Sequence, residues 1–300
     1  MKVFVTGASG FVGGAVVPEL LKAGHKVVAL ARSAKAEQKI KQLDPHIEIV
    51  KGSLKDLDVL KRTAAASDGV VHLGFIQDFS RFEEVSLIDR KATLAMLDAL
   101  KGTNKPYVQT AVALVFPPGT LGTETSPKHA VGPGAIRSET EDIVLSHENK
   151  GVRATSVRLP PSVHGGGDPN FITALVKIAS GTKKSYINDG ANLWAAVSRF
   201  DAGVVFRLAL EKGHAGTSYH AVAEEGVKTK DIAGAIGQLL KVPVVSVEGD
   251  KAAEHFKGLA AFFSGGGPVS SKITQEQLGW QPKEIGLLDD IRANYGFATK

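Results

Sequence analysis

The chain opens with MKVFVTGASGFVGG, residues 1–14, and this stretch decides the fold. The apolar run Val3–Val5 predicts a buried strand, glycines follow at positions 7, 10 and 13, and a helix-like segment comes next. Glycine permits a tight turn, and the free N–H groups at a helix N-terminus favour an anion. The spacing GxxGxxG differs from the general GxGxxG fingerprint. The order of strand, glycine turn and helix nevertheless predicts a site for the diphosphate of a dinucleotide.

Apolar runs rich in β-branched residues alternate with amphipathic stretches through the first two thirds of the chain. The strand-like runs are Val3–Thr6, His25–Leu30, Ile47–Val50, Gly69–Leu73, Tyr107–Phe116 and Val152–Leu159. The helix-like stretches are Gly10–Ala23, Ala34–Leu43, Asp56–Ala66, Phe82–Leu100 and Gly134–Asn149. This alternation predicts an α/β fold with a Rossmann-type, doubly wound parallel sheet.

The pattern changes from Pro160 onward, where glycine- and proline-containing loops separate shorter elements. We predict a dinucleotide-binding Rossmann domain over residues 1–158, to which residues from about 195 to 222 return. Residues 159–194 and 223–300 are then expected to form a small, discontinuous C-terminal substrate lobe.

Composition excludes several functions. The chain has no cysteine, so disulfides, thiolate nucleophiles and cysteine-ligated metals are impossible. His214 and His220 lie in different predicted elements and have no nearby carboxylate at ligand spacing, so we assign no metal. No run reaches the roughly 18 apolar residues of a membrane span, and the chain opens on a strand-like segment, so we expect a cytoplasmic protein without membrane contact. The net charge of +5 comes from lysines and arginines scattered among acids, which does not favour nucleic-acid binding.

The end of the second strand-like run bears on which dinucleotide is bound. Ala31 stands where NAD-binding proteins carry an acid for the ribose 2′-hydroxyl. Arg32 and Ser33 follow, and a guanidinium and a hydroxyl suit a 2′-phosphate. We therefore predict a preference for NADP(H) over NAD(H); the alternative is an ordinary surface arginine.

Six stretches carry a resemblance to a known family. They are TGASGFVG from Thr6, GSL from Gly52, VVHLGF from Val70, RLPPSVHG from Arg158, RFD from Arg199 and LGWQP from Leu278. Together they resemble the atypical extended short-chain dehydrogenase/reductases, described as NAD(P)-dependent epimerase/dehydratase-like, over nearly the whole chain. The residues RLPPSVHG from Arg158 are most similar to the corresponding stretch of the atypical subgroup.

The resemblance implies where a nicotinamide dinucleotide would lie. Its diphosphate would contact the turn formed by Gly7, Ser9, Gly10, Phe11, Val12 and Gly13. Ser53 and Leu54 would lie near the adenine, although Ser53 replaces the family's aspartate. Leu73, Gly74 and Phe75 would follow the cofactor, and Pro160, Pro161 and Ser162 would approach the nicotinamide.

The catalytic pair of this family is missing. Its members use a tyrosine and a lysine four residues later, whereas none of Tyr107, Tyr186, Tyr219 and Tyr295 has a lysine at that spacing. Alignment of the helix backward from Gly151 places Pro133 at the tyrosine position and Arg137 at the lysine position. Val112 replaces the catalytic serine, which leaves Thr110 as the nearby hydroxyl.

Three residues are therefore candidates for catalysis: Arg137, His164 and Thr110. Arg137 could stabilise an oxyanion or hold the cofactor ribose, or instead pair with Glu141. His164 could transfer a proton near neutral pH, or be a loop histidine bonded to backbone. Thr110 could be only a strand residue.

Arg199 could face a substrate carboxylate or phosphate, or pair with Asp201 or Asp189. Tyr186 and Trp194 could form an aromatic pocket wall or belong to the core.

We expect an NADPH-dependent oxidoreductase that reduces a carbonyl or a polarised double bond in a small apolar molecule. One alternative is a non-catalytic NADP-sensing protein, and another is a redox-neutral epimerase or lyase. A homodimer through Phe82–Leu100 and Gly134–Asn149 is compatible with the sequence, as is exposure of both helices.

Overall fold

The computed structural model describes residues 1–117, 119–129, 134–182, 185–187, 189–247, 250–256, 260, 263 and 265–299. Pro133 lies outside the described residues, and so does the side chain of Tyr186. No helix in the described part of the chain combines the length and the apolarity that a membrane span requires.

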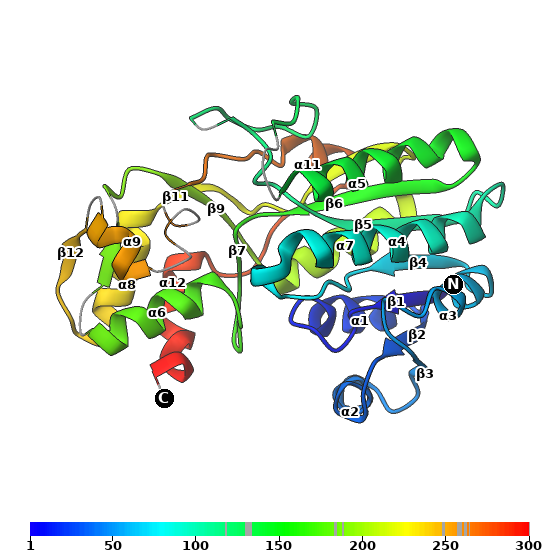
Figure 1. The fold of residues 1–300 in the computed structure, drawn as a ribbon, viewed down its shortest axis with the longest axis horizontal. Coiled ribbons are helices and arrows are strands. Elements are labelled where there is room, and N and C mark those ends of the chain that lie inside the picture. Colours follow the sequence, from blue (N-terminus) through cyan, green and yellow to red (C-terminus); the bar gives the residue numbers. More distant parts are fainter. Residues whose placement is uncertain are drawn as a thin grey trace.

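The main sheet has seven parallel strands in the order β10-β6-β5-β4-β1-β2-β3 (Figure 1). Its strands are β1 (Lys2–Thr6), β2 (Lys26–Ala31), β3 (Glu48–Lys51), β4 (Gly69–His72), β5 (Pro106–Val112), β6 (Arg153–Leu159) and β10 (Thr217–His220). The chain moves outward from β1 in one direction through β2 and β3, and then in the other direction through β4, β5 and β6. This is the doubly wound Rossmann order, and the predicted fold class is confirmed.

Helices cover both faces of this sheet. One face packs against α1 (Gly13–Lys22), α2 (Ala34–Leu43) and α7 (Arg199–Lys212), and the other against α3 (Leu57–Ala65), α4 (Phe82–Leu100) and α5 (Ala135–Leu145). Alternation along β1 explains the two layers, because the side chains of Val3 and Val5 point to the α1 face of the sheet and that of Phe4 to the α4 face. Short 3₁₀ turns, Phe79–Arg81 and Ser146–Lys150, flank α4 and α5.

A second core lies beside the sheet. It is built around the three-stranded sheet β11-β9-β7, whose strands are β7 (Ser162–His164), β9 (Leu193–Ser198) and β11 (Glu224–Lys228). The helices of this region are α6 (Phe171–Thr182), α8 (Thr229–Leu240), α9 (Asp250–Phe256) and α12 (Leu287–Asn294), followed by the 3₁₀ turn Tyr295–Thr299. The two-stranded pair of β8 (Ser185–Ile187) and β12 (Val244–Ser246) completes it. Helix α11 (Lys272–Leu278) instead packs against α7 and β10 at the large sheet.

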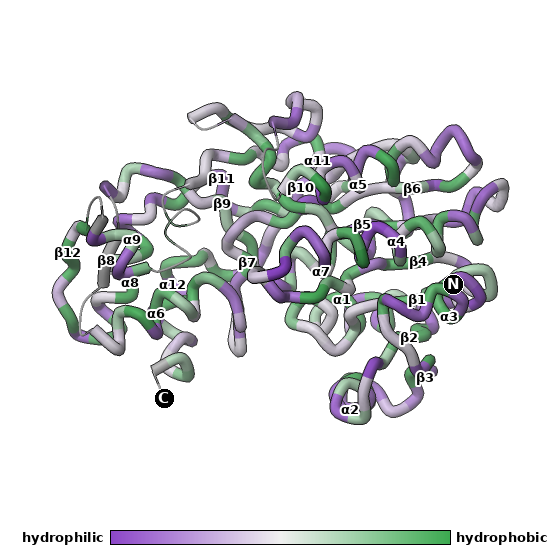
Figure 2. The backbone as a smooth tube through the Cα atoms, in the orientation of Figure 1, coloured by the Kyte–Doolittle hydropathy of each residue, from purple (hydrophilic) through white to green (hydrophobic). Residues whose placement is uncertain are grey.

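Several predicted boundaries shift. The strand predicted over Tyr107–Phe116 ends at Val112, and the first helix begins at Gly13 and not at Gly10. Within the stretch from about 195 to 222, β9 joins the small sheet, whereas α7 and β10 join the large one. Figure 2 shows that the strands at the centre of the large sheet are mostly hydrophobic, as expected for strands buried on both faces.

Candidate functional site

The glycine turn connects β1 to α1 by a backbone path that few other residues could follow. Gly7 has a φ of 72°, and a Cβ there would lie 2.7 Å from the backbone nitrogen of Gly74. A Cβ on Gly13 would lie 2.2 Å from the carbonyl oxygen of Gly7. The Gly10 amide donates to that same Gly7 oxygen at 2.9 Å, which closes the turn. Glycine is therefore required where the turn meets the helix and the neighbouring strand.

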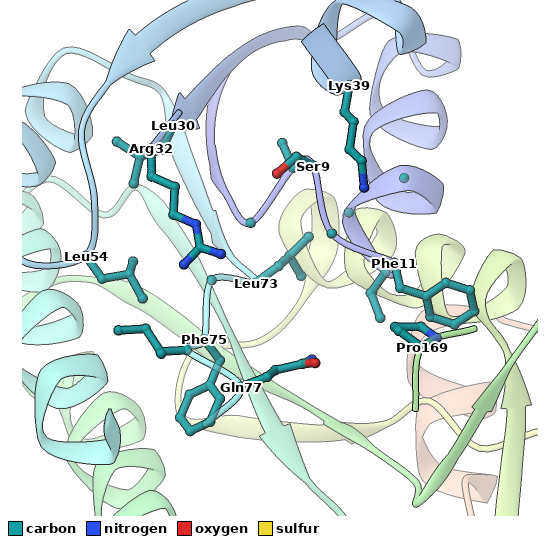
Figure 3. A pocket seen from close by; sticks show the side chains of 18 of the residues that line it. Ser9, Phe11, Leu30, Arg32, Lys39, Leu54, Leu73, Phe75, Gln77 and Pro169 are labelled. Atoms are coloured by element: carbon teal, nitrogen blue, oxygen red, sulfur yellow. The ribbon is translucent and has the colours of Figure 1, made fainter. Parts of the chain in front are cut away.

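This turn forms one wall of a cavity of about 880 Å³ (Figure 3). The cavity lies beyond the carboxyl ends of β1 and β4, where the strand order reverses. Ligands of open α/β sheets bind at such a switch point. The segment 73–77 after β4 faces the turn across the cavity, and residues 166–170 after β7 close its far end.

The charged side chains that line the cavity, among the described residues, are all positive. Arg32, Lys39, Lys55 and Arg199 line it, and no carboxylate does so among the described residues. In Figure 3 the side chains of Arg32 and Lys39 extend into the cavity from two directions, one from the end of β2 and one from α2. Such a site favours a polyanion.

A buried chain of hydrogen bonds lies beneath the turn. The Gly74 amide donates to Thr6 Oγ1 at 3.0 Å, Thr6 Oγ1 contacts His72 Nδ1 at 2.5 Å, and His72 Nε2 contacts Asp89 Oδ1 at 3.1 Å. All three side chains are buried. The chain joins the turns after β1 and β4, so the two walls of the cavity are held in a fixed relation.

Arg137 lies under this region and does not line the cavity itself. Its Nη2 donates to the carbonyl oxygen of Thr110 at 3.0 Å, and its Cζ is 4.2 Å from the centre of the Phe75 ring. Its Nε is buried without a partner, and burial lowers the pKa of the guanidinium. The alternative pairing with Glu141 does not form, because Glu141 binds Arg158.

The Thr110 hydroxyl donates to the carbonyl oxygen of His72 at 2.8 Å. It does not line the cavity.

His164 ends β7 with a buried ring. Its Nδ1 lies 2.8 Å from Asp290 Oδ2 on α12, and only 1% of the residue surface is exposed. The ring does not line the cavity, so the structure gives no support to proton transfer from His164 to a substrate. Its partner is a carboxylate and not the backbone group expected of a loop histidine.

Most of the residues named for cofactor binding come together in the cavity. These are Gly7, Ser9, Gly10, Phe11, Val12, Gly13, Arg32, Ser53, Leu54, Leu73, Gly74 and Phe75. Six others do not line it: Ser33, Thr110, Arg137, Pro160, Pro161 and Ser162. Ser33 instead caps α2 by accepting from the Ala36 amide at 3.2 Å, and Ser162 Oγ is buried without a partner. Trp194 packs against Phe171 and Phe263 in the second core.

Sequence reasoning missed other residues that line the cavity. They include Lys39, Gln42 and Lys55 at one end, Gln77 in the middle wall, and Gly166, Gly167, Pro169 and Asn170 at the other end. Lys39 had a detectable signal, because it lies on the helix-like stretch Ala34–Leu43 that follows Arg32 and Ser33. The segment 166–170 had none, since only packing of the second core brings it to the glycine turn.

Fold and site together define a Rossmann-type protein that binds a dinucleotide beside a smaller lobe, the class of the extended short-chain dehydrogenase/reductases. The model of the NAD dependent epimerase/dehydratase family matches residues 3–223, so the chain belongs to that family. The predicted resemblance is confirmed, and members of this family depend on nicotinamide dinucleotides.

Relatives extend over the whole chain. The chain is 52% identical to the uncharacterized protein YLL056C of Saccharomyces cerevisiae, across 98% of this chain and 99% of that one. It is 25% identical to a quinoline-oxide ketoreductase of Stigmatella aurantiaca, across 73% of this chain and 67% of that one. Among solved structures, the UDP-glucuronic acid 4-epimerase of Bacillus cereus in complex with NAD has a TM-score of 0.80 at 18% identity, with 99% of this chain and 98% of that one covered. That likeness shows the shared fold.

Proposed function

We propose that this protein is an NADPH-dependent reductase that acts on a carbonyl or a polarised double bond in a small, largely apolar molecule. The observation that carries the proposal is the cavity at the switch point, with its glycine turn and its four cations unopposed by any carboxylate among the described residues. Some relatives of low identity are reductases, such as the Stigmatella ketoreductase, and this supports reduction as the proposed reaction.

The cavity fits a nicotinamide dinucleotide. Side chains at Gly7 and Gly13 would collide with backbone atoms, so the turn can stay narrow and present its amides. The α1 N-terminus has no acidic residue in its first turn, which keeps its positive end available to the diphosphate. Leu30 and Leu54 supply the apolar surface that an adenine ring needs.

The preference for NADPH depends on the cations near the adenosine end. Arg32 follows β2 directly, and Ala31 leaves no carboxylate to repel a 2′-phosphate. Lys39 adds a second cation from α2, and Ser9 provides a hydroxyl from the turn (Figure 3). A phosphate bound by two cations gains charge-assisted hydrogen bonds that a 2′-hydroxyl could not form.

The proposed reduction requires few side chains of the protein itself. The nicotinamide supplies the hydride when the cofactor is bound. Tyr107, Tyr219 and Tyr295 are buried and do not line the cavity, so none of them replaces the family's acid. We propose that water protonates the product. Arg137 does not line the cavity, and its guanidinium would support the Phe75 wall from beneath by packing on the Phe75 ring.

A direct test is NADPH oxidation, followed by absorbance, with a panel of ketones, enones and imines. We expect turnover with NADPH and at least about tenfold weaker kcat/KM with NADH. Bound NADPH that no compound oxidises would contradict the reductase and favour the alternative of an NADP-sensing protein. One observation favours an NADP-sensing protein: none of the four tyrosines has a lysine four residues later.

A further inference from the structure

Arg199 differs from the other cations of the cavity in its place and its surroundings. Arg32 follows β2, Lys39 belongs to α2 and Lys55 to the segment before α3, in the part of the cavity where the adenosine is proposed to lie. Arg199 is the first residue of α7, directly after β9 of the small sheet. It therefore stands where the two sheets meet, and ligand sites form preferentially at such junctions.

The guanidinium of Arg199 is held in place without a direct ion pair among the described residues. Its Cζ lies 4.9 Å from the centre of the Phe11 ring and 4.7 Å from that of Phe200. Its stem packs against Gly165, where an added Cβ would lie 3.3 Å from Arg199 Cγ. Two aromatic faces and a glycine thus fix the side chain by cation–π contact and packing.

The expected carboxylate partners of Arg199 are used elsewhere. Asp201 accepts from the backbone amides of Lys283 and Glu284, and Asp189 accepts from the Ala191 amide. Asp290 binds His164 and Asn294, and it acts on Arg199 only through a charge interaction beyond ion-pair distance. Within the described part of the chain the Arg199 guanidinium makes no hydrogen bond or ion pair, and its Nε is buried. A buried donor without a partner is unfavourable, and a bound anion would satisfy it.

We propose that Arg199 binds an anionic group of the substrate, a carboxylate or a phosphate, in the end of the cavity lined by Gly166 and Gly167. The inference rests on the proposed function and narrows its substrate to a molecule with an apolar body and one oxyanion. We assign the anion to the substrate and not to the cofactor for two reasons. The α1 N-terminus already provides for the diphosphate, and the segment 166–170 follows β7 of the small sheet.

The test compares carbonyl compounds supplied as pairs, each as the free 2-oxo acid and as its methyl ester, with NADPH as reductant. For the wild-type protein we expect kcat/KM to favour the acids by about 10- to 100-fold. Arg199→Met should remove that preference by lowering the rate on acids while leaving the esters unchanged. If the anion belongs to the substrate, the dissociation constant of NADPH should stay within twofold.

Arg207→Met is the matched control. Arg207 lies two turns further along α7, pairs with Glu211 at 2.7 Å and does not line the cavity. It should keep the acid preference of the wild type. Equal rates on acids and esters in the wild type would overturn the inference while leaving the reductase intact. Weaker NADPH binding by Arg199→Met would overturn it too, by assigning Arg199 to the cofactor.

A binding measurement tests the anion site even if the protein reduces none of the compounds. The melting temperature of the NADPH-loaded protein is measured with 2-oxo acids, with their methyl esters and with inorganic phosphate. Stabilisation by the acids or by phosphate, lost in Arg199→Met and kept in Arg207→Met, supports the anion site even if the reductase proposal fails. No stabilisation of the wild type by either anion contradicts the site.

Discussion

The imidazole of His164 and the carboxylate of Asp290 lie 2.8 Å apart although 126 residues separate them in the chain. The bond ties the end of β7 to α12, and the segment 166–170 that closes the cavity begins two residues later. Burial alone would raise the pKa of Asp290, but hydrogen bonds from His164 and Asn294 outweigh it and leave that pKa below its usual value. The pair therefore positions the far wall of the cavity.

Replacement of Asp290 by asparagine should destabilise the protein. The change removes a buried charge from a paired histidine, and we expect the free energy of unfolding to fall by about 2–4 kcal/mol. Urea denaturation measures it. Asp289→Asn is the control on the same helix, because Asp289 is exposed and pairs with the exposed Arg292, and it should leave stability nearly unchanged. If the two variants unfold with equal urea midpoints and equal slopes, the His164–Asp290 bond contributes nothing to stability.

Gly13→Ala and Gly14→Ala should differ sharply although the residues are neighbours. A Cβ at position 13 meets the Gly7 oxygen at 2.2 Å, whereas one at position 14 meets nothing within 4 Å. We expect Gly13→Ala to lose about 2–4 kcal/mol of stability through overpacking. Gly14→Ala should gain up to about 1 kcal/mol, because alanine is the better helix former. Thermal unfolding without nucleotide compares them, and a stable Gly13→Ala would refute the narrow turn.

Arg32→Met should weaken NADPH binding selectively. The loss of one charge-assisted contact to a phosphate should raise the dissociation constant of NADPH by about 10- to 100-fold and that of NADH by less than about twofold. Isothermal titration gives both constants. Lys35→Met serves as the control, because Lys35 is exposed on α2 and does not line the cavity. A parallel loss of NADH affinity in Arg32→Met would remove the case for a 2′-phosphate site.

Stability should fall in mildly acidic solution because of His220. Burial lowers the pKa of this histidine from 6.5 to about 4. Its Nδ1 lies 2.7 Å from the Ser270 carbonyl oxygen and its Nε2 accepts from Arg158 at 3.2 Å, which suits the neutral ring. Glu124 and Glu141 also face it and favour the charged ring, but desolvation outweighs them.

Above pH 6.5 the ring is neutral in the folded and the unfolded chain, so His220 adds no pH dependence there. Between pH 6.5 and 4 only the unfolded chain binds the proton, and the free energy of unfolding should drop by about 3 kcal/mol across that window. His220→Gln should flatten this slope, whereas His46→Gln, which changes an exposed histidine, should keep it. Urea titrations at several pH values decide between these outcomes, and an unchanged slope in His220→Gln would contradict the assignment.

The sequence by itself determined the Rossmann sheet, the glycine turn and the place of Arg32. These features are local: strand and helix periods repeat within about ten residues, and the turn needs its glycines because neighbouring backbone atoms crowd it. The limit of local reasoning shows after Val112, where apolar Ala113 and Val115 suggested a longer strand. Both are buried, but the strand ends there: the Ala113 amide makes one more bond to Leu159 of β6, and its side chain packs with Ala195 and Val222.

Only the tertiary structure decided that His164 binds Asp290, that Lys39 faces the cavity, and that Arg199 stands unpaired beside Gly166 and Gly167. Each depends on contacts between elements far apart in the chain. Whether a histidine or an arginine is a partner of an acid or a free group depends on what surrounds it after packing. Sequence spacing carries no record of that environment, because burial and pairing are set by the second core that forms between residues 162 and 298.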